Sequence, residues 1–189
     1  MVGVVLAGGY SSRAKVNKLL LEVDRKPLIC HTIDSIKPFC KKVFVVTGKY
    51  HEELSKVLHD VEIVYNKDFD LGMFSSVLAG ARASVGEDVL LIPGDISNVS
   101  SATIEALLHG TKDIRIPSFE GITGHPVFIS KKYVELLTQE PVSSKLCDFL
   151  NAHASVKEVI SVNDPFINFD IDTIEDYNRF INTRKEVTL

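Results

Sequence analysis

The chain has few cysteines, and no two of them stand at a spacing typical of a disulfide framework or a metal site. Cys30, Cys40 and Cys147 are odd in number, lie far apart and include no Cys-x-x-Cys pair. Disulfide-rich folds and structural zinc sites use several cysteines at short, regular spacings. We therefore expect neither a disulfide framework nor a zinc site, and thiols that are buried or partly buried in a reducing compartment.

Long apolar runs and an excess of basic charge are also missing. No stretch approaches the roughly 18 consecutive apolar residues of a membrane-spanning helix. The apolar run Val2–Leu6 is short and has no basic leader, so it predicts a first strand rather than a secretory signal. A net charge of -4 over 189 residues gives no sign of nucleic-acid binding. These absences predict a cytoplasmic protein that binds neither membrane nor nucleic acid.

What is present is the composition of an ordinary globular domain, with 45% hydrophobic and 24% charged residues. Short apolar runs alternate with segments of helical spacing, which is typical of parallel strands covered by crossover helices. Strands are predicted near residues 2–6, 42–46, 61–65, 89–92, 114–117, 127–129 and 167–172, and helices near 27–36, 51–59, 74–83, 131–138 and 144–152, after Ser100-Ser101, and from Thr173 onward. The pattern predicts an α/β fold with a mostly parallel sheet, in one domain with a substrate-binding lobe inserted after the fourth strand.

A basic, glycine-rich loop follows the first predicted strand. Residues 7–18 hold two adjacent glycines, two serines and the side chains of Arg13, Lys15 and Lys18, and no acidic residue occurs before Glu22. Ligands of open α/β sheets bind at the carboxyl ends of strands, where glycines admit a ligand to the backbone and basic side chains neutralise phosphates. The loop is therefore predicted to bind an anion.

Three better-known glycine motifs do not fit this loop. A Walker-type loop requires Gly-Lys followed by Ser or Thr, and the loop contains no Gly-Lys. A dinucleotide fingerprint requires a third glycine and an acidic residue at the end of the second strand, which here reads Val45-Val46-Thr47-Gly48. A serine-hydrolase elbow requires a second glycine after its serine, and residues 9–13 lack one.

Carboxylates follow two of the predicted strands. Asp95 comes directly after the strand at residues 89–92 and its Pro-Gly turn, and Asp170 and Asp172 share one face of the strand at 167–172. A few oxygen groups of this kind, completed by substrate phosphates and water, are what Mg²⁺ accepts. A capping role for Asp95 and a solvated strand face for the other two aspartates remain open on these residues alone.

Several motifs of the chain resemble those of a known family. The stretch Leu6-Ala7-Gly8-Gly9-Tyr10-Ser11-Ser12-Arg13, followed by Lys18-Leu19-Leu20, looks like the signature of the molybdenum-cofactor nucleotidyltransferases. Further motifs stand in the family's order, namely Gly72-Met73-Phe74-Ser75-Ser76 with Gly80, Asp95, Gly124-His125-Pro126 and Asp170-Ile171-Asp172-Thr173. The resemblance covers nearly the whole chain.

The resemblance implies a three-layer, Rossmann-like nucleotidyltransferase fold of the GT-A type over residues 1–189. Residues 1–100 would bind the nucleotide, and 101–189 would bind the acceptor and supply the last metal ligands. The implied nucleotide-binding residues are Leu6, Ala7, Gly8, Gly9, Ser11, Arg13, Lys18, Ser75, Ser76 and Gly80, and the implied catalytic residues are Arg13, Lys18 and Asp95. The implied Mg²⁺ ligands are Asp95, Asp170 and Asp172, and the implied acceptor-binding residues are Gly124, His125 and Pro126.

The implied reaction transfers CMP or GMP from a nucleoside triphosphate to a phosphorylated acceptor, molybdopterin in the family, with a molybdoenzyme or chaperone as a further partner. Gly8 resembles the guanylyltransferase branch, whereas the Gly-His-Pro and Gly72 motifs resemble the cytidylyltransferase branch, so both CTP and GTP stay open. A sugar- or alditol-phosphate acceptor also stays open. The family has Met and Gly where this chain has Ala14 and Lys15, and Pro where it has Ser97, which keeps open a nucleotide-binding protein without activity.

Overall fold

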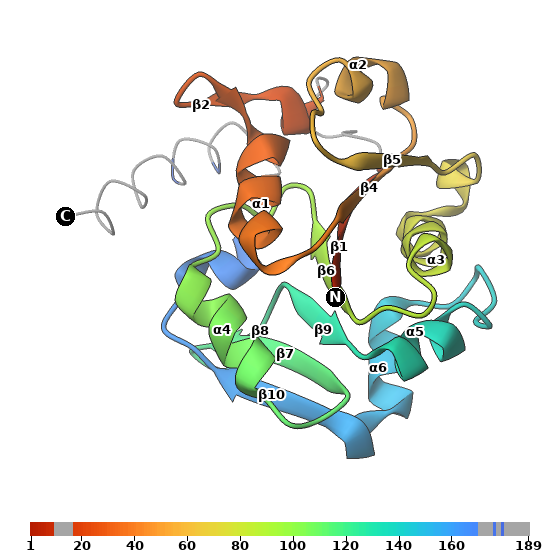
Figure 1. The fold of residues 1–189 in the computed structure, drawn as a ribbon, viewed down its shortest axis with the longest axis vertical. Coiled ribbons are helices and arrows are strands. Elements are labelled where there is room, and N and C mark those ends of the chain that lie inside the picture. The colour runs from red at the N-terminus through yellow and green to blue at the C-terminus, as the bar shows by residue number, and fades with distance from the viewer. Residues whose placement is uncertain (10–16, 170–175, 177–178, 180–189) are drawn as a thin grey trace.

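The computed structural model describes residues 1–9, 17–169, 176 and 179, and is drawn as a ribbon in Figure 1. Its centre is one sheet in the strand order β10-β7-β9-β6-β1-β4-β5, with β8 paired to β7. The strands are β1 (Val2–Ala7), β4 (Val43–Thr47), β5 (Glu62–Tyr65), β6 (Val89–Pro93), β7 (Ile114–Phe119), β8 (Ile122–Thr123), β9 (Val127–Ile129) and β10 (Lys157–Ser161). β9 runs antiparallel to both β6 and β7, and β8 antiparallel to β7, whereas the other pairs are parallel.

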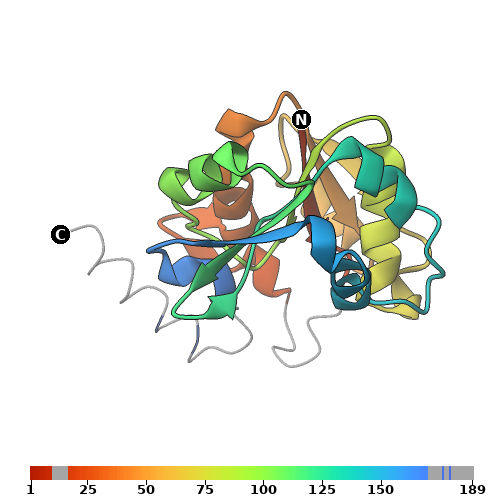
Figure 2. The ribbon, with the colours of Figure 1, turned by 90° about the horizontal axis from the view of Figure 1, so that it is seen from below.

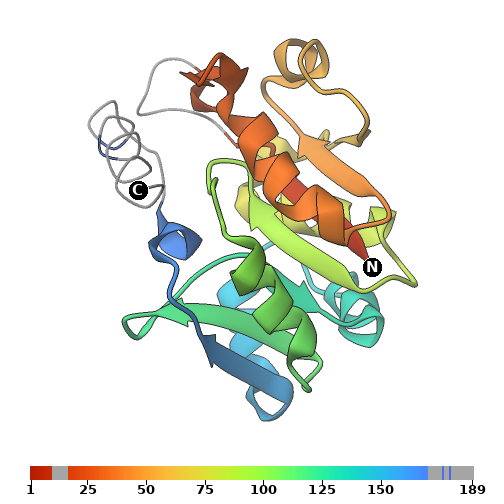
Figure 3. The same cartoon turned by 60° about the vertical axis from the view of Figure 1, so that its left-hand side comes forward.

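Helices cover both faces of this sheet. They are α1 (Leu28–Ile36), α2 (His51–Ser55), α3 (Met73–Ala83), α4 (Ser101–His109), α5 (Lys131–Leu137) and α6 (Leu146–Ala152). One hydrophobic cluster joins the sheet to α3, α5 and α6, and a second joins it to α1, α2 and α4. Figures 1 and 2 show α1 and α4 on one side of the strands and α3 on the other, and in Figure 3 α1 and α4 lie in front of the sheet. The predicted α/β fold with helices on both faces is confirmed.

The central strands form because their residues are apolar on both faces. In β1, Val2 and Val4 belong to the cluster under α3, whereas Val5 and Ala7 belong to the cluster under α1. Continuous apolar runs of this kind are typical of parallel strands covered on both sides. The six predicted strands up to residue 129 are confirmed, with ends that differ by one or two residues.

Residues after β6 extend the same sheet instead of forming a separate lobe. β9 adds to the edge of β6, β7 adds to β9, and β10 adds to β7. The expected inserted lobe is therefore replaced by an extension of the central sheet. Within the described ranges, no helix has the length and apolar character needed to cross a membrane.

The predicted strand at residues 167–172 is wrong where the structure describes it. Ile167 and Asn168 lie in the 3-10 turn η5 (Pro165–Asn168), and the remainder of that prediction, with the helix from Thr173, falls outside the described residues. The turn forms because Asp164 Oδ1 accepts a hydrogen bond from the Phe166 N–H at 3.0 Å and Pro165 occupies its first turn. An Asp-Pro start of this kind favours a turn over an extended strand.

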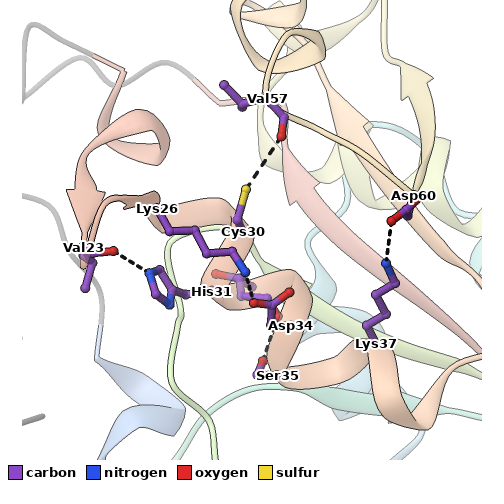
Figure 4. Close-up of polar contacts among 10 residues, drawn as sticks. Val23, Lys26, Cys30, His31, Asp34, Ser35, Lys37, Val57 and Asp60 are labelled. Carbon is purple, nitrogen blue, oxygen red and sulfur yellow. Dashed lines mark hydrogen bonds and ion pairs between the residues drawn. The ribbon is translucent and has the colours of Figure 1, made fainter.

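A small antiparallel ribbon, β2 (Glu22–Val23) with β3 (Lys26–Pro27), precedes α1 and was not predicted. Figure 4 shows how α1 holds it: His31 Nε2 is hydrogen-bonded to the Val23 carbonyl at 2.8 Å, and Lys26 pairs with Asp34. In the same view, Lys37 and Asp60 pair at 3.6 Å on the far end of the helix. These contacts connect α1 to the ribbon and to the turn before β5.

Candidate nucleotide and metal site

The carboxyl ends of β1, β4 and β6 meet at one edge of the sheet. Ala7 is paired with Thr47 and Leu6 with Pro93, and the Gly94 N–H donates to the Leu6 carbonyl at 2.8 Å. The residues that follow these strands therefore leave the sheet side by side. This is the edge at which open α/β sheets bind ligands.

Lys18 and Asp95 meet at this edge as an ion pair. Lys18 Nζ lies 2.5 Å from Asp95 Oδ2, and the two side chains are 17% and 18% exposed. Charge-assisted contacts of this length are stronger than neutral hydrogen bonds, and partial burial reduces their screening by water. The structure thus brings together two of the three predicted catalytic residues. Arg13 and Ser11 lie outside the described residues.

Backbone packing sets the position of this ion pair. Lys18 begins the 3-10 turn η1 (Lys18–Leu20), where Asn17 Oδ1 accepts from the Leu19 N–H at 3.2 Å. A Cβ on Gly94 would lie 3.4 Å from Leu19 Cδ2, so η1 packs directly on the turn that carries Asp95. The Thr32 hydroxyl of α1 donates to the Gly94 carbonyl at 2.8 Å and holds that turn from the other side.

A neutral polar cluster stands at the same edge, beyond β1 and β4. Asn66 follows β5 and donates through Nδ2 to Ser75 Oγ at 2.8 Å and to Ser76 Oγ at 3.1 Å. The three residues are 5%, 4% and 3% exposed. The N–H groups at the start of α3 are partly engaged, because the Ser75 N–H donates to the Gly72 carbonyl at 3.1 Å.

Three glycines of the predicted nucleotide site have different surroundings. A Cβ on Gly8 would overlap Ser76 Oγ, so only glycine fits there without moving that hydroxyl. Gly9 is exposed, and a Cβ on it would meet nothing within 4 Å. Gly80 is not brought to this edge. A Cβ on it would lie 2.5 Å from Val4 Cγ1 and 3.3 Å from Val46 Cγ2, so Gly80 serves the close packing of α3 on the sheet.

The Gly124-His125-Pro126 segment lies close to Asp95. The His125 N–H donates to the Ile167 carbonyl at 2.6 Å, and the Gly124 N–H donates to the Pro117 carbonyl at 2.9 Å. Burial lowers the pKa of His125, while a hydrogen bond with the Leu91 backbone and the charge of Asp95 act in the opposite direction. Nδ1 of the ring is buried and has no hydrogen-bond partner among the described residues.

The candidate metal ligands are only partly described. Asp95 follows β6 at the ligand-binding edge, and Asp170 and Asp172 lie outside the described residues. Among the residues that the structure places, no group of three or more His, Cys, Asp or Glu side chains could hold a metal ion. The carboxylate of Asp95 is already paired with a cation, the ammonium group of Lys18.

Sequence reasoning missed Asn66, Gly48 and Thr32. A Cβ on Gly48 would lie 2.5 Å from the Gly8 carbonyl oxygen, so the glycine after β4 permits the glycine after β1 to sit beside it. Asn66 carried one weak signal, its position directly after a predicted strand on the ligand-binding edge. Nothing in the sequence pointed to Thr32, because its partner is a backbone carbonyl 62 residues away.

Comparison with known proteins places the chain among nucleotidyltransferases. The profile of the MobA-like NTP transferase domain matches residues 3–156. The molybdenum cofactor cytidylyltransferase of Escherichia coli (strain K12) is 27% identical over 180 residues, 92% of each chain. The "Probable molybdenum cofactor guanylyltransferase" of Pyrococcus horikoshii is 31% identical over 110 residues, 57% of this chain and 55% of the relative. The bifunctional protein GlmU of Carboxydothermus hydrogenoformans is 26% identical over 111 residues, 57% of this chain and 25% of the relative.

Solved structures share the fold. A nucleotidyl transferase from Methanothermobacter thermautotroptrophicus superposes with a TM-score of 0.84 at 23% identity, covering 98% of each chain. A manganese complex of a protein from Mycobacterium tuberculosis H37Rv superposes with a TM-score of 0.75 at 21% identity, covering 96% of this chain and 97% of the other. The likeness extends over nearly all of both chains, so the extension of the sheet beyond β6 belongs to the shared fold.

Proposed function

The chain belongs to the MobA-like NTP transferase family, whose profile covers residues 3–156, and from that premise we propose a specific reaction. It is the Mg²⁺-dependent transfer of a nucleoside monophosphate from CTP or GTP to a phosphorylated acceptor, molybdopterin, with release of pyrophosphate. The observation that carries the proposal is the ion pair of Lys18 with Asp95 at the edge where the glycine-rich loop leaves β1.

The reaction needs no general base from the protein. An oxygen of the acceptor phosphate forms a bond to the α-phosphorus of the triphosphate, and the bond from that phosphorus to the bridging oxygen of pyrophosphate breaks. A phosphate monoester has a second pKa of ~6, so its oxygens are already deprotonated at neutral pH. Catalysis then consists of alignment and neutralisation of charge.

Asp95 is the described member of the proposed ligand set, and its carboxylate suits a hard divalent cation. Asp95 offers a carboxylate oxygen at the strand end and interacts with His125, whose N–H donates to the Ile167 carbonyl of η5. Asp170 and Asp172 follow η5 in the sequence. These three carboxylates would hold Mg²⁺ with phosphate oxygens and water. When bound, the ion would neutralise the charge that builds on the phosphate oxygens. A manganese complex of a protein with the same fold supports the use of a divalent metal.

Each remaining group has a proposed task. Lys18 neutralises the triphosphate together with Arg13, and the backbone at Gly8 and Gly9 approaches the nucleotide. The Ser75 and Ser76 hydroxyls face the same edge from α3. His125 and its neighbours contact the acceptor beside Asp95, where the charge of that aspartate reaches the ring.

A second acceptor class is a sugar or alditol phosphate, which the shared fold with a "Putative Glucose-1-Phosphate Thymidylyltransferase" from Bacillus anthracis favours, at a TM-score of 0.79 and 17% identity. The test is pyrophosphate release from CTP, GTP, ATP and UTP with Mg²⁺, in the presence of molybdopterin or of a panel of sugar phosphates. Pyrophosphate release that requires molybdopterin supports the proposal. Release that is driven by a sugar phosphate would show that the acceptor is a sugar phosphate and not molybdopterin. Nucleotide binding without release on any acceptor would identify a binding protein without activity.

A substitution at the ion pair tests the metal assignment. Asp95→Asn keeps the shape of the side chain and removes its charge, so we expect loss of pyrophosphate release with an unchanged far-ultraviolet spectrum. Asp60→Asn is a matched control, because Asp60 lies on the surface and its side chain is 85% exposed. Full activity of the Asp95 variant would overturn the assignment, whereas the Asp60 variant is expected to behave as the unmodified protein.

A further inference from the structure

Asn66 organises the neutral polar cluster that stands beside Gly8. Resting on the nucleotide-binding function proposed above, we propose that Asn66 is a positioning residue which makes the Ser76 hydroxyl a hydrogen-bond donor toward the base of the bound nucleotide. Asn66 is 5% exposed and uses both ends of its amide inside the protein.

The orientation of the Asn66 amide is determined by a backbone group. The Asp68 N–H donates to Asn66 Oδ1 at 3.0 Å, and a backbone N–H can only donate. The carbonyl end of the amide therefore faces Asp68, and the NH₂ end faces the two serines. The Asn66 N–H donates to the Thr47 carbonyl at 2.9 Å, which holds the residue at the carboxyl end of β4.

The two serines then differ in whether their hydroxyl hydrogen is already donated inside the protein. The Ser75 hydroxyl donates to the Gly72 carbonyl at 2.7 Å, so its hydrogen is used and its oxygen accepts from Asn66. Ser76 Oγ accepts the second amide hydrogen at 3.1 Å, and within the described residues the Ser76 hydroxyl donates to no group. A buried donor without an acceptor is rare in folded proteins and indicates a missing partner.

The position of Ser76 points this donor at the ligand edge. A Cβ on Gly8 would overlap Ser76 Oγ, and Gly8 lies at the end of β1 beside the glycine after β4. Asn66, Ser75 and Ser76 are all uncharged, whereas Lys18 and Asp95 stand on the β6 side of β1. Charge therefore favours phosphates and metal on the β6 side and the neutral base on the Ser76 side. The acceptor to which the Ser76 hydroxyl donates is a carbonyl oxygen or an unprotonated ring nitrogen of the base.

Isothermal titration of the full chain, with Mg²⁺ and the triphosphate that it binds most tightly, tests this role. In Asn66→Asp the carboxylate has no hydrogen to donate, so both serine hydroxyls turn toward it and Ser76 no longer donates to the base. We expect affinity to fall about tenfold, the value of one hydrogen bond, and Ser76→Ala to show a similar loss. The double variant should lose no more than either single variant, because Asn66 acts through Ser76.

Inorganic tripolyphosphate with Mg²⁺ is the matched control ligand, since it has no base. Its affinity should be the same in the unmodified chain and in both single variants. An equal loss with tripolyphosphate would overturn the assignment to the base, and losses that add in the double variant would overturn the route through Ser76. If Asn66→Asp does not fold, Ser76→Ala still tests the inference. A triphosphate affinity of Ser76→Ala equal to that of the unmodified chain would overturn it. If the unmodified chain binds no triphosphate, the proposed function fails first and the inference with it.

Discussion

At the residue scale, the candidate site depends on a few positions whose roles come from close contacts. The basic loop, Asp95 and the serines of α3 could be recognised from the sequence, because charge and glycine content are visible there. Asn66 could not, because its role is set by which neighbours its amide meets. Gly80 was read as part of the nucleotide site, although its lack of a side chain serves packing against Val4. A glycine required by a ligand and a glycine required by a neighbouring strand look the same in a sequence.

His125 should make the stability of the protein depend on pH. Burial lowers the pKa of this ring in the folded state below its ordinary value of 6.5. Below that pH the unfolded chain binds a proton that the folded chain does not, so the free energy of unfolding falls as the pH falls, and levels off below the folded pKa. We expect urea unfolding midpoints to decline from pH 7 toward acid, as for other proteins with a buried neutral histidine.

The variant His125→Gln isolates this contribution, because glutamine stays neutral at every pH of the series. The stability of the variant should change less between pH 7 and 5.5 than that of the unmodified chain. His59→Gln provides a control, since His59 is an exposed histidine outside the site. An identical pH dependence in the His125 variant and the unmodified chain would contradict the buried neutral state of this ring.

At the scale of elements, sequence patterns were sufficient where strands are buried on both faces. β1, β4 and β6 consist of apolar residues that belong to the two core clusters, and all three were predicted. β10 was missed because it is an edge strand in which partly buried and exposed residues mix, so no apolar run marks it. The ribbon β2–β3 was missed because each strand has only two residues. Periodicity finds buried elements, whereas short or half-exposed ones depend on tertiary contacts.

Asp164 links two elements that sequence reasoning treated separately. Its Oδ2 accepts from the Ser100 N–H and from the Thr103 hydroxyl, both at 2.8 Å, and its Oδ1 accepts from the Phe166 N–H at 3.0 Å. The carboxylate therefore caps η5 and lies at the N-terminus of α4, where negative charge is favourable. At the other end of α4, Arg115 Nη1 donates to the carbonyls of Leu107 and Leu108 at 2.9 and 3.2 Å.

We expect Asp164→Ala to be one of the more destabilising substitutions in the chain. It removes three hydrogen bonds at a residue that is 3% exposed and leaves buried donors unpaired, a loss of roughly 2–4 kcal/mol. Ser100→Ala is the matched control, because it removes the side-chain cap that accepts from the Thr103 N–H and the contact with the Thr103 hydroxyl but leaves Asp164 in place, at a cost of about 1 kcal/mol. Guanidinium unfolding measures both. Equal losses in the two variants would show that Asp164 does not join η5 to α4.

At the scale of the whole molecule, the proposed nucleotide-binding and acceptor-binding parts share one sheet. β6 pairs with β1 on one side and with β9 on the other, so the boundary near residue 100 passes through a continuous set of strands. The hydrophobic cluster under α3 also joins both parts, since it contains Val4 and Phe74 together with Ile129 and Phe149. Among the residues that the structure describes, neither part has a core of its own, and we infer that the chain is one folding unit.

This arrangement predicts a single cooperative unfolding transition. Far-ultraviolet circular dichroism reports the helices of both parts, and near-ultraviolet signals report the five tyrosines, since the chain has no tryptophan. The two signals should give the same midpoint and the same slope in urea, as expected for a two-state domain. A fragment of residues 1–100 should stay unfolded, because β6 would become an open edge and the cluster under α3 would lose α5 and α6. Two separate transitions, or a folded fragment, would show instead that the nucleotide site stands on a domain of its own.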